Sequence, residues 1–169
     1  DQLGLDKVRL VGQSMGGFIS TKFAIEHRHR VEKLALVCPI GLPVPAEHPT
    51  VDFLKVPPQE LPALLAFDPQ TVVKHLPRGE PPPEFIAERT KEAVTAGRVL
   101  AAGTFDPKLP RYLHRLTMPT LLVWGKHDRL TPTAQHEAWA KALPNAAVKL
   151  LERAGHLVLD ESSEAVAAI

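Results

Sequence analysis

Residues 8–17 read Val-Arg-Leu-Val-Gly-Gln-Ser-Met-Gly-Gly, and they say more about the architecture than any other part of the chain. An apolar run ends in Gly12-x-Ser14-x-Gly16, and a helical pattern follows at once. We predict a tight strand-to-helix turn there, because glycines on both sides of Ser14 leave room where a Cβ would collide with backbone. Such a turn exposes the Ser14 hydroxyl at a helix N-terminus, where backbone N–H groups can stabilise a developing negative charge.

This pattern, between a strand and a helix, is typical of the nucleophile elbow of serine hydrolases. A glycine-rich turn with an incidental serine is the alternative interpretation. The chain has four serines, and Ser14 alone lies at such a junction; the others are Ser20, Ser162 and Ser163. A serine hydroxyl is a weak nucleophile, so it needs a histidine to take its proton and an acid to orient that histidine.

Among the eight histidines, His156 is the best candidate for the base. The strand-like residues 147–151 lead into Glu-Arg-Ala-Gly-His, and Gly155 lets the imidazole turn back toward the edge of the sheet. A surface position in a loop is the alternative for His156. Solvated surface is the simpler interpretation for most of the others: His27, His29, His48, His75, His114 and His136.

The acid is expected at the end of another strand. Residues 119–125 form a continuous apolar run of the kind found in buried parallel strands, and Asp128 follows in the next loop. The neighbouring His127 is a rival base, but it precedes the acid. Thr131 and Pro132 predict a helix start, with Thr131 as the N-cap. An ordinary loop carboxylate is the alternative for Asp128.

The order Ser14, Asp128, His156 is that of the α/β-hydrolases and differs from the chymotrypsin and subtilisin orders. The chain resembles this superfamily over nearly its whole length apart from the middle. The matching pieces are Val11–Gly17, Leu121–Asp128 and Leu151–His156.

The resemblance implies a mechanism in which Ser14 attacks, His156 shuttles the proton and Asp128 orients the imidazole. The backbone N–H of Met15 would hold the oxyanion. Family members have several strands before the elbow, including a loop that supplies a second oxyanion donor. Residues 1–7 look like the tail of a helix and a loop, so we expect an N-terminally truncated chain without that donor.

The remaining elements alternate between strands and helices, which predicts a mostly parallel sheet, the C-terminal part of an α/β-hydrolase fold. The expected strands are 8–12, 33–38, 119–125 and 147–151, and the expected helices are 15–27, 133–143 and 160–169. The side chains expected on the inner helix faces are Phe18, Ile19, Phe23, Ala24, Ala138, Trp139 and Ala142.

The middle of the chain breaks this rhythm, since 12 of its 17 prolines lie between Pro39 and Pro83. No central strand accommodates that density. Helical patterns cover 59–67, 70–76 and 83–102. The resemblance implies a cap inserted here, with the domains 1–41 (core), 42–116 (helical cap) and 117–169 (core). The cap's apolar side chains either line an acyl or aryl pocket or, as we favour for most, hold the cap together; they include Leu54, Leu64, Leu65, Phe67, Phe85 and Ile86.

Some family members carry the triad acid after the strand that follows the elbow helix. Residues 38–41 occupy that place here and read Cys-Pro-Ile-Gly, without a carboxylate, which leaves Asp128 as the acid. The single cysteine, Cys38, excludes an internal disulfide and is expected to be buried packing.

A net charge of +1 gives no reason to invoke nucleic acid or a membrane surface as a partner, and no apolar run is long enough to cross a bilayer. The sequence has neither a metal-ligand cluster nor a dinucleotide fingerprint, so we expect no cofactor and no metal. We expect a cytoplasmic protein that acts on a small-molecule ester or ketone, with its oligomeric state left open.

The favoured function is a carboxylesterase-like serine hydrolase of small acyl or aryl esters. A carbon–carbon bond hydrolase of aromatic degradation is an alternative, although Leu157 stands where those enzymes often place a tryptophan. An acyltransferase would use the same triad. The non-enzymatic alternatives are an inactive hydrolase fragment and a hydrolase-like binding protein.

Overall fold

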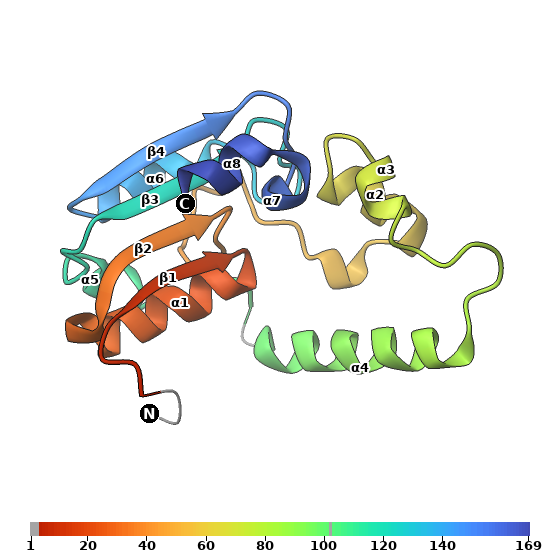
Figure 1. Cartoon of the computed structure of the whole chain (residues 1–169), viewed down its shortest axis with the longest axis horizontal. Helices are drawn as coiled ribbons and strands as arrows, with labels where there is room; N and C mark the ends of the chain where they lie inside the picture. The colour runs from red at the N-terminus through yellow and green to blue at the C-terminus, as the bar shows by residue number, and fades with distance from the viewer. Residues whose placement is uncertain (1–3, 102) are drawn as a thin grey trace.

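The computed structural model describes residues 4–101 and 103–169, which contain a four-stranded sheet of order β1-β2-β3-β4 (Figure 1). All three strand pairs are parallel, as the alternation of strands and helices predicts. The strands are β1 (Val8–Gln13), β2 (Val31–Val37), β3 (Thr120–Gly125) and β4 (Ala146–Leu151). The predicted α/β fold with a parallel sheet is therefore confirmed, with strand bounds shifted by one or two residues.

The two central strands form the core of the molecule. Leu36 and Val37 of β2, and Val123 and Trp124 of β3, are fully buried. Their continuous apolar sequence suits strands that are covered on both faces. Because parallel strands share one direction, the carboxyl ends of all four strands meet at the same edge of the sheet.

Helices cover both faces of this sheet, and α6 and α8 lie on opposite sides of it (Figure 1). The helices outside the middle of the chain are α1 (Met15–Glu26), α6 (Gln135–Ala142), α7 (Val158–Glu161) and α8 (Ser163–Ala168). The predicted single helix 160–169 is wrong, because Ser162 is extended and ends α7. The Ser162 hydroxyl then accepts a hydrogen bond from Ala165 N and so caps α8.

The predicted inner face of α1 is correct at Ala24, which is fully buried, and at Phe18, which is partly buried against the core, and it is wrong at Ile19 and Phe23. The buried residues of α1 are Gly17, Ser20, Thr21 and Ala24, whereas Ile19 is 54% exposed. Small side chains face the sheet because the helix passes very close to it: a Cβ at Gly17 would lie 3.1 Å from the carbonyl oxygen of Gly12 in β1 and 2.8 Å from Cβ of Pro39, just after β2. In α6, by contrast, the inward prediction for Trp139 is correct, since its side chain is fully buried.

The start of α6 also differs from its prediction. The helix begins at Gln135 with Ala134 as the N-cap, and Thr131 lies in a turn before it. The Thr131 hydroxyl is engaged elsewhere, because it donates a hydrogen bond to the carboxylate of Asp128. The Thr-Pro pair therefore marks the loop between β3 and α6 rather than the first turn of the helix.

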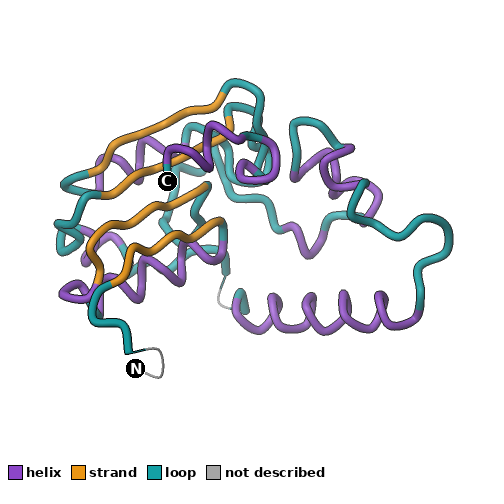
Figure 2. The backbone as a smooth tube through the Cα atoms, in the orientation of Figure 1, coloured by secondary structure: helices purple, strands orange, loops and turns teal. Residues whose placement is uncertain are grey.

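Residues 42–116, called the helical segment below, join β2 to β3 through helices of 4 to 17 residues (Figure 2). They are α2 (Leu61–Leu65), α3 (Gln70–Val73), α4 (Pro83–Val99) and α5 (Pro110–Leu113), with 3-10 turns at Phe53–Lys55 and Pro58–Glu60. The three predicted helical stretches are shorter in the structure, and residue 102, at the end of one of them, lies outside the described residues. None of the described helices is both long and apolar enough to cross a membrane.

Candidate active site at the carboxyl ends of the strands

Ser14 lies between the end of β1 and the start of α1, in a strained backbone conformation. Its φ is 54° and its ψ is −120°, a region that residues other than glycine rarely adopt. The turn is held by two backbone contacts: Ser14 N–H donates to Val37 O at 2.8 Å, and Ser14 O accepts from Ile40 N–H at 3.2 Å. The sharp strand-to-helix turn is thus present where the sequence predicts it.

The two glycines of the G-x-S-x-G pattern have different roles. A Cβ at Gly12 would collide with the carbonyl of Gly16 and the hydroxyl of Ser20. Apart from its chain neighbours and the nearby backbone of its own helix, a Cβ at Gly16 would meet no described atom within 4 Å, so the prediction that Gly16 avoids a collision is wrong. The close approach involves the carbonyl oxygen of Gly16 rather than its Cα.

Asp128 lies in the loop that follows β3, and its side chain is almost completely buried. Its Oδ1 accepts hydrogen bonds from the backbone N–H groups of Leu130 and Thr131, at 2.9 and 2.8 Å. Its Oδ2 accepts from the Thr131 hydroxyl at 2.6 Å. These donors stabilise a buried carboxylate and fix the direction in which its remaining lone pairs point.

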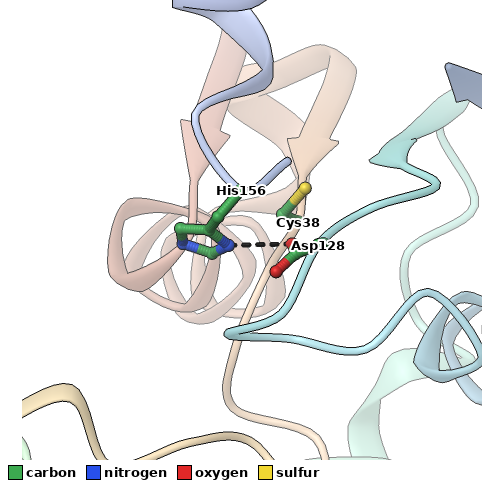
Figure 3. A group of neighbouring side chains, drawn as sticks. All are labelled: Cys38, Asp128 and His156. Atoms are coloured by element: carbon green, nitrogen blue, oxygen red, sulfur yellow. Dashed lines mark hydrogen bonds and ion pairs between the residues drawn. The ribbon is translucent and has the colours of Figure 1, made fainter. Parts of the chain in front are cut away.

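His156 follows β4 and meets Asp128 through its ring (Figure 3). Nδ1 of His156 lies 2.9 Å from Oδ2 of Asp128. Because a carboxylate can only accept, this contact requires the proton on Nδ1, which leaves Nε2 of the neutral ring as a base. Within the described residues, Nε2 of His156 is buried and has no hydrogen-bond partner.

Gln13 joins the turn at Ser14 to the loop that carries His156. Its side-chain Nε2 donates to the backbone carbonyl of His156 at 2.8 Å, although the two residues are 143 positions apart. The residue beside Ser14 therefore contacts the residue expected to act as its base. The structure brings Asp128 and His156 into direct contact, and it connects Ser14 to them through this bridge.

Cys38, directly after β2, is the third side chain beside the Asp128–His156 pair (Figure 3). The Cys38 sulfur, a ring nitrogen of His156 and a carboxylate oxygen of Asp128 all lie within 4.8 Å of one another. Burial, together with the neighbouring Asp128 carboxylate, raises the pKa of the Cys38 thiol well above its ordinary value. Cys38 is buried as predicted, but it packs against the polar pair and has a φ of 43°.

A cavity of about 300 Å³ opens beside Ser14. Its walls are mostly apolar and come from both the core and the helical segment; they include Met15, Ile40, Val51, Phe53 and Leu130. Met15 is also the first residue of α1, so its backbone N–H lies at the N-terminus of that helix. A hollow of this size and character fits a small apolar group next to a reacting carbonyl.

The six apolar side chains considered above as either pocket lining or packing within the cap do not border this cavity. Leu54, Phe85 and Ile86 border a separate hollow of about 590 Å³ along α4. Phe67 borders another, of about 620 Å³, beside β4 and α8. Neither of these hollows is lined by Ser14, whereas the cavity of about 300 Å³ is, so we assign the candidate site to that cavity.

The rival base, His127, is exposed and packs its ring 4.7 Å from the ring of Phe67. Sequence reasoning missed the contacts of Gln13, Thr131 and Glu161: the side chain of Thr131 contacts the acid, and those of Gln13 and Glu161 contact the histidine loop. Only Gln13 carried a signal, because it lies inside the G-x-S-x-G pattern.

The sequence profile described as the alpha/beta hydrolase family matches residues 1–169. The chain is 29% identical over 175 residues to a 2-hydroxy-6-oxononadienedioate/2-hydroxy-6-oxononatrienedioate hydrolase of Dechloromonas aromatica, covering 92% of this chain and 58% of the relative. It is 28% identical over 179 residues to the monoacylglycerol lipase abhd6-B of Xenopus laevis, covering 95% and 53%.

Solved structures agree with these relatives. The 2-hydroxy-6-oxo-6-phenylhexa-2,4-dienoate hydrolase of Rhodococcus sp. strain RHA1 superposes with a TM-score of 0.72 at 27% identity, covering 98% of this chain and 63% of that one. The chain thus spans a little over half of the length of the proteins that it matches. From its sequence and its fold, the chain belongs to the alpha/beta hydrolase family.

Proposed function

We propose that the protein is a serine hydrolase in which Ser14, His156 and Asp128 form the catalytic triad. The buried Asp128–His156 pair, with a free Nε2, is the observation that carries this proposal. The strained turn at Ser14 supports it, because such strain is typical of functional sites and persists only where the surroundings hold it.

In this mechanism His156 Nε2 takes the proton from the Ser14 hydroxyl as Ser14 Oγ attacks the substrate carbonyl. Asp128 keeps the imidazole in the required tautomer and stabilises the imidazolium that forms. The Met15 N–H, at the start of α1, donates to the oxyanion. His156 then protonates the leaving alcohol, and water attacks the acyl-enzyme by the same route.

A small acyl or aryl ester is the proposed substrate class. The cavity of about 300 Å³ beside Ser14 is lined mostly by apolar side chains and suits a short acyl chain or a single ring. We also propose that the helical segment acts as a cap, since Val51 and Phe53 supply part of the cavity wall.

The experiment that tests this proposal measures the hydrolysis of p-nitrophenyl acetate and p-nitrophenyl butyrate by the full-length protein. Ser14→Ala and His156→Ala should each lower turnover by about 10⁴- to 10⁶-fold, and Asp128→Ala somewhat less, because the three groups act as a unit. His127→Ala is the matched control and should keep its activity. An equal loss in His127→Ala would mean that the wrong histidine is assigned as the base.

Cleavage of a carbon–carbon bond beside a ketone is the second candidate, favoured by the names of several relatives. It would use the same nucleophile and base. The two functions are separated by comparing kcat/KM for 2-hydroxy-6-oxo-6-phenylhexa-2,4-dienoate with kcat/KM for the p-nitrophenyl esters. The higher value identifies the function. Labelling by a fluorophosphonate separates both from a binding protein without catalysis.

A further inference from the structure

The loop that carries His156 packs against residues 63–68 of the helical segment. The two backbones come so close that there is no room for a side chain at Gly155. A Cβ there would lie 2.6 Å from the backbone nitrogen of Phe67 and 2.7 Å from the carbonyl carbon of Ala66. Leu157 N–H, on the other side of His156, donates to Leu65 O at 2.9 Å. Backbone of the helical segment thus contacts both neighbours of His156.

Glu161, the last residue of α7, joins these two pieces of chain with one carboxylate. Its Oε2 accepts from Gly155 N–H at 2.6 Å, and its Oε1 accepts from Asp68 N–H at 2.9 Å. The two donors are 87 positions apart in sequence, one beside His156 and one at the entry to α3. A carboxylate that binds two backbone N–H groups holds them at a fixed separation, because charged acceptors make short, strong hydrogen bonds.

The same stretch of the helical segment also touches the loop that carries the acid. Arg129 donates from Nη1 to Ala63 O at 3.0 Å, and the rings of His127 and Phe67 pack together. Residues 63–68 therefore contact the loops of both Asp128 and His156. Among these contacts, only that of Glu161 is made by one side chain that binds both segments, at Gly155 N–H and Asp68 N–H. A substitution of Glu161 therefore removes the contact without changing either segment.

We propose that Glu161 is a positioning residue that locks the His156 loop to the helical segment and thereby aims His156 Nε2 at Ser14. This inference rests on the proposed function, because it takes His156 as the base. A shift of about 1 Å in a catalytic group can cost on the order of 10²-fold in rate. Loss of the Glu161 carboxylate would release Gly155 and Asp68 together and let the histidine loop move.

The test compares Glu161→Ala and Glu161→Gln with Glu164→Gln in the full-length protein. Glu164 is an exposed acid on the next helix, where it pairs with Lys149. The Ala variant should lower kcat by about 10- to 10²-fold with KM changed less than about 2-fold. The Gln variant keeps one acceptor oxygen and should lose less, and Glu164→Gln should match the wild type.

Hydrogen–deuterium exchange of the Gly155 and Asp68 amides is the second measurement, and it does not depend on catalysis. Both amides should exchange faster in Glu161→Ala, at least one of them should exchange faster in Glu161→Gln, and neither should change in Glu164→Gln. If the wild type hydrolyses none of the substrates, yet both amides lose protection in Glu161→Ala, the proposed function fails. The link that Glu161 makes between the histidine loop and the helical segment then still stands. The wild type can be active while both Glu161 variants fold and keep the wild-type kcat and the wild-type amide exchange rates. In that case the positioning role of Glu161 is refuted and the proposed function stands. If Glu161→Ala does not fold, Glu161→Gln alone decides the question.

Discussion

Gln13 and His156 are 143 positions apart, yet Nε2 of Gln13 donates a 2.8 Å hydrogen bond to the backbone carbonyl of His156. The contact ties the turn that exposes Ser14 to the loop that presents the proposed base. It fixes the histidine through its backbone, whereas Asp128 fixes it through its ring.

Replacing Gln13 with Met keeps the length of the side chain and removes the donor. We expect kcat for p-nitrophenyl butyrate to fall by about 10-fold with little change in KM, since one hydrogen bond that positions the base is lost. Steady-state kinetics measure both constants. Gln59→Met, at an exposed position of the helical segment, serves as the control. Wild-type kinetics in Gln13→Met would show that the bridge does not position His156.

Thr131 donates its hydroxyl to the buried carboxylate of Asp128 at 2.6 Å. Thr131→Val has nearly the same shape and lacks that donor, so Asp128 should be held less firmly against His156. The expected losses are about 10-fold in kcat and about 1.5–3 kcal/mol in the free energy of unfolding, the usual range for a hydrogen bond to a charged group. Kinetics and urea unfolding test this, with the exposed Thr90→Val as the control. Unchanged kinetics would place Thr131 outside the site.

The overall architecture follows from the sequence because its signals are local. Continuous apolar runs such as 119–125 predict buried parallel strands, and the glycines around Ser14 predict the turn. The contacts between distant segments do not follow, because Gln13 meets His156, and Glu161 meets Asp68, only in the folded chain. Ile19 and Phe23 illustrate the same limit: periodicity marks a helix, but the close packing of α1 on the sheet selects small side chains for its inner face.

Gly155 has no room for a methyl group between the histidine loop and the backbone of residues 66–67. Gly155→Ala should therefore push these two backbones apart, destabilise the protein by about 1–3 kcal/mol and lower kcat by about 10-fold or more. Thermal unfolding and kinetics measure the two effects.

Gly97→Ala in α4 is the matched control for that prediction. Its new Cβ would come no nearer than 4.0 Å to Leu54, and alanine is favoured over glycine inside a helix by about 0.8–1.0 kcal/mol. It should keep its activity and unfold at the same or a higher temperature. Equal behaviour of the two variants would contradict the account of Gly155.

Cys38 predicts a dependence of stability on alkaline pH. Burial and Asp128 raise the pKa of its thiol in the folded state, so the unfolded chain releases the proton first as the pH rises. The contribution of the Cys38 thiol to the free energy of unfolding is therefore intact below about pH 8.5, the pKa of a thiol in the unfolded chain. It is lost at higher pH, by up to about 1.4 kcal/mol per pH unit. Urea unfolding of the wild type and Cys38→Ala between pH 7 and 10 should give curves that diverge above that pKa. Parallel curves would contradict the raised pKa.

The most direct test of the proposed function is the site of covalent labelling by a fluorophosphonate. Tryptic cleavage after Arg9 and Lys22 releases one peptide with both Ser14 and Ser20, so fragmentation must locate the adduct within it. We predict a single adduct on Ser14 in the full-length protein, lost in His156→Ala and retained in His127→Ala. No adduct, or an adduct on Ser20, would contradict the assignment of Ser14 as the nucleophile.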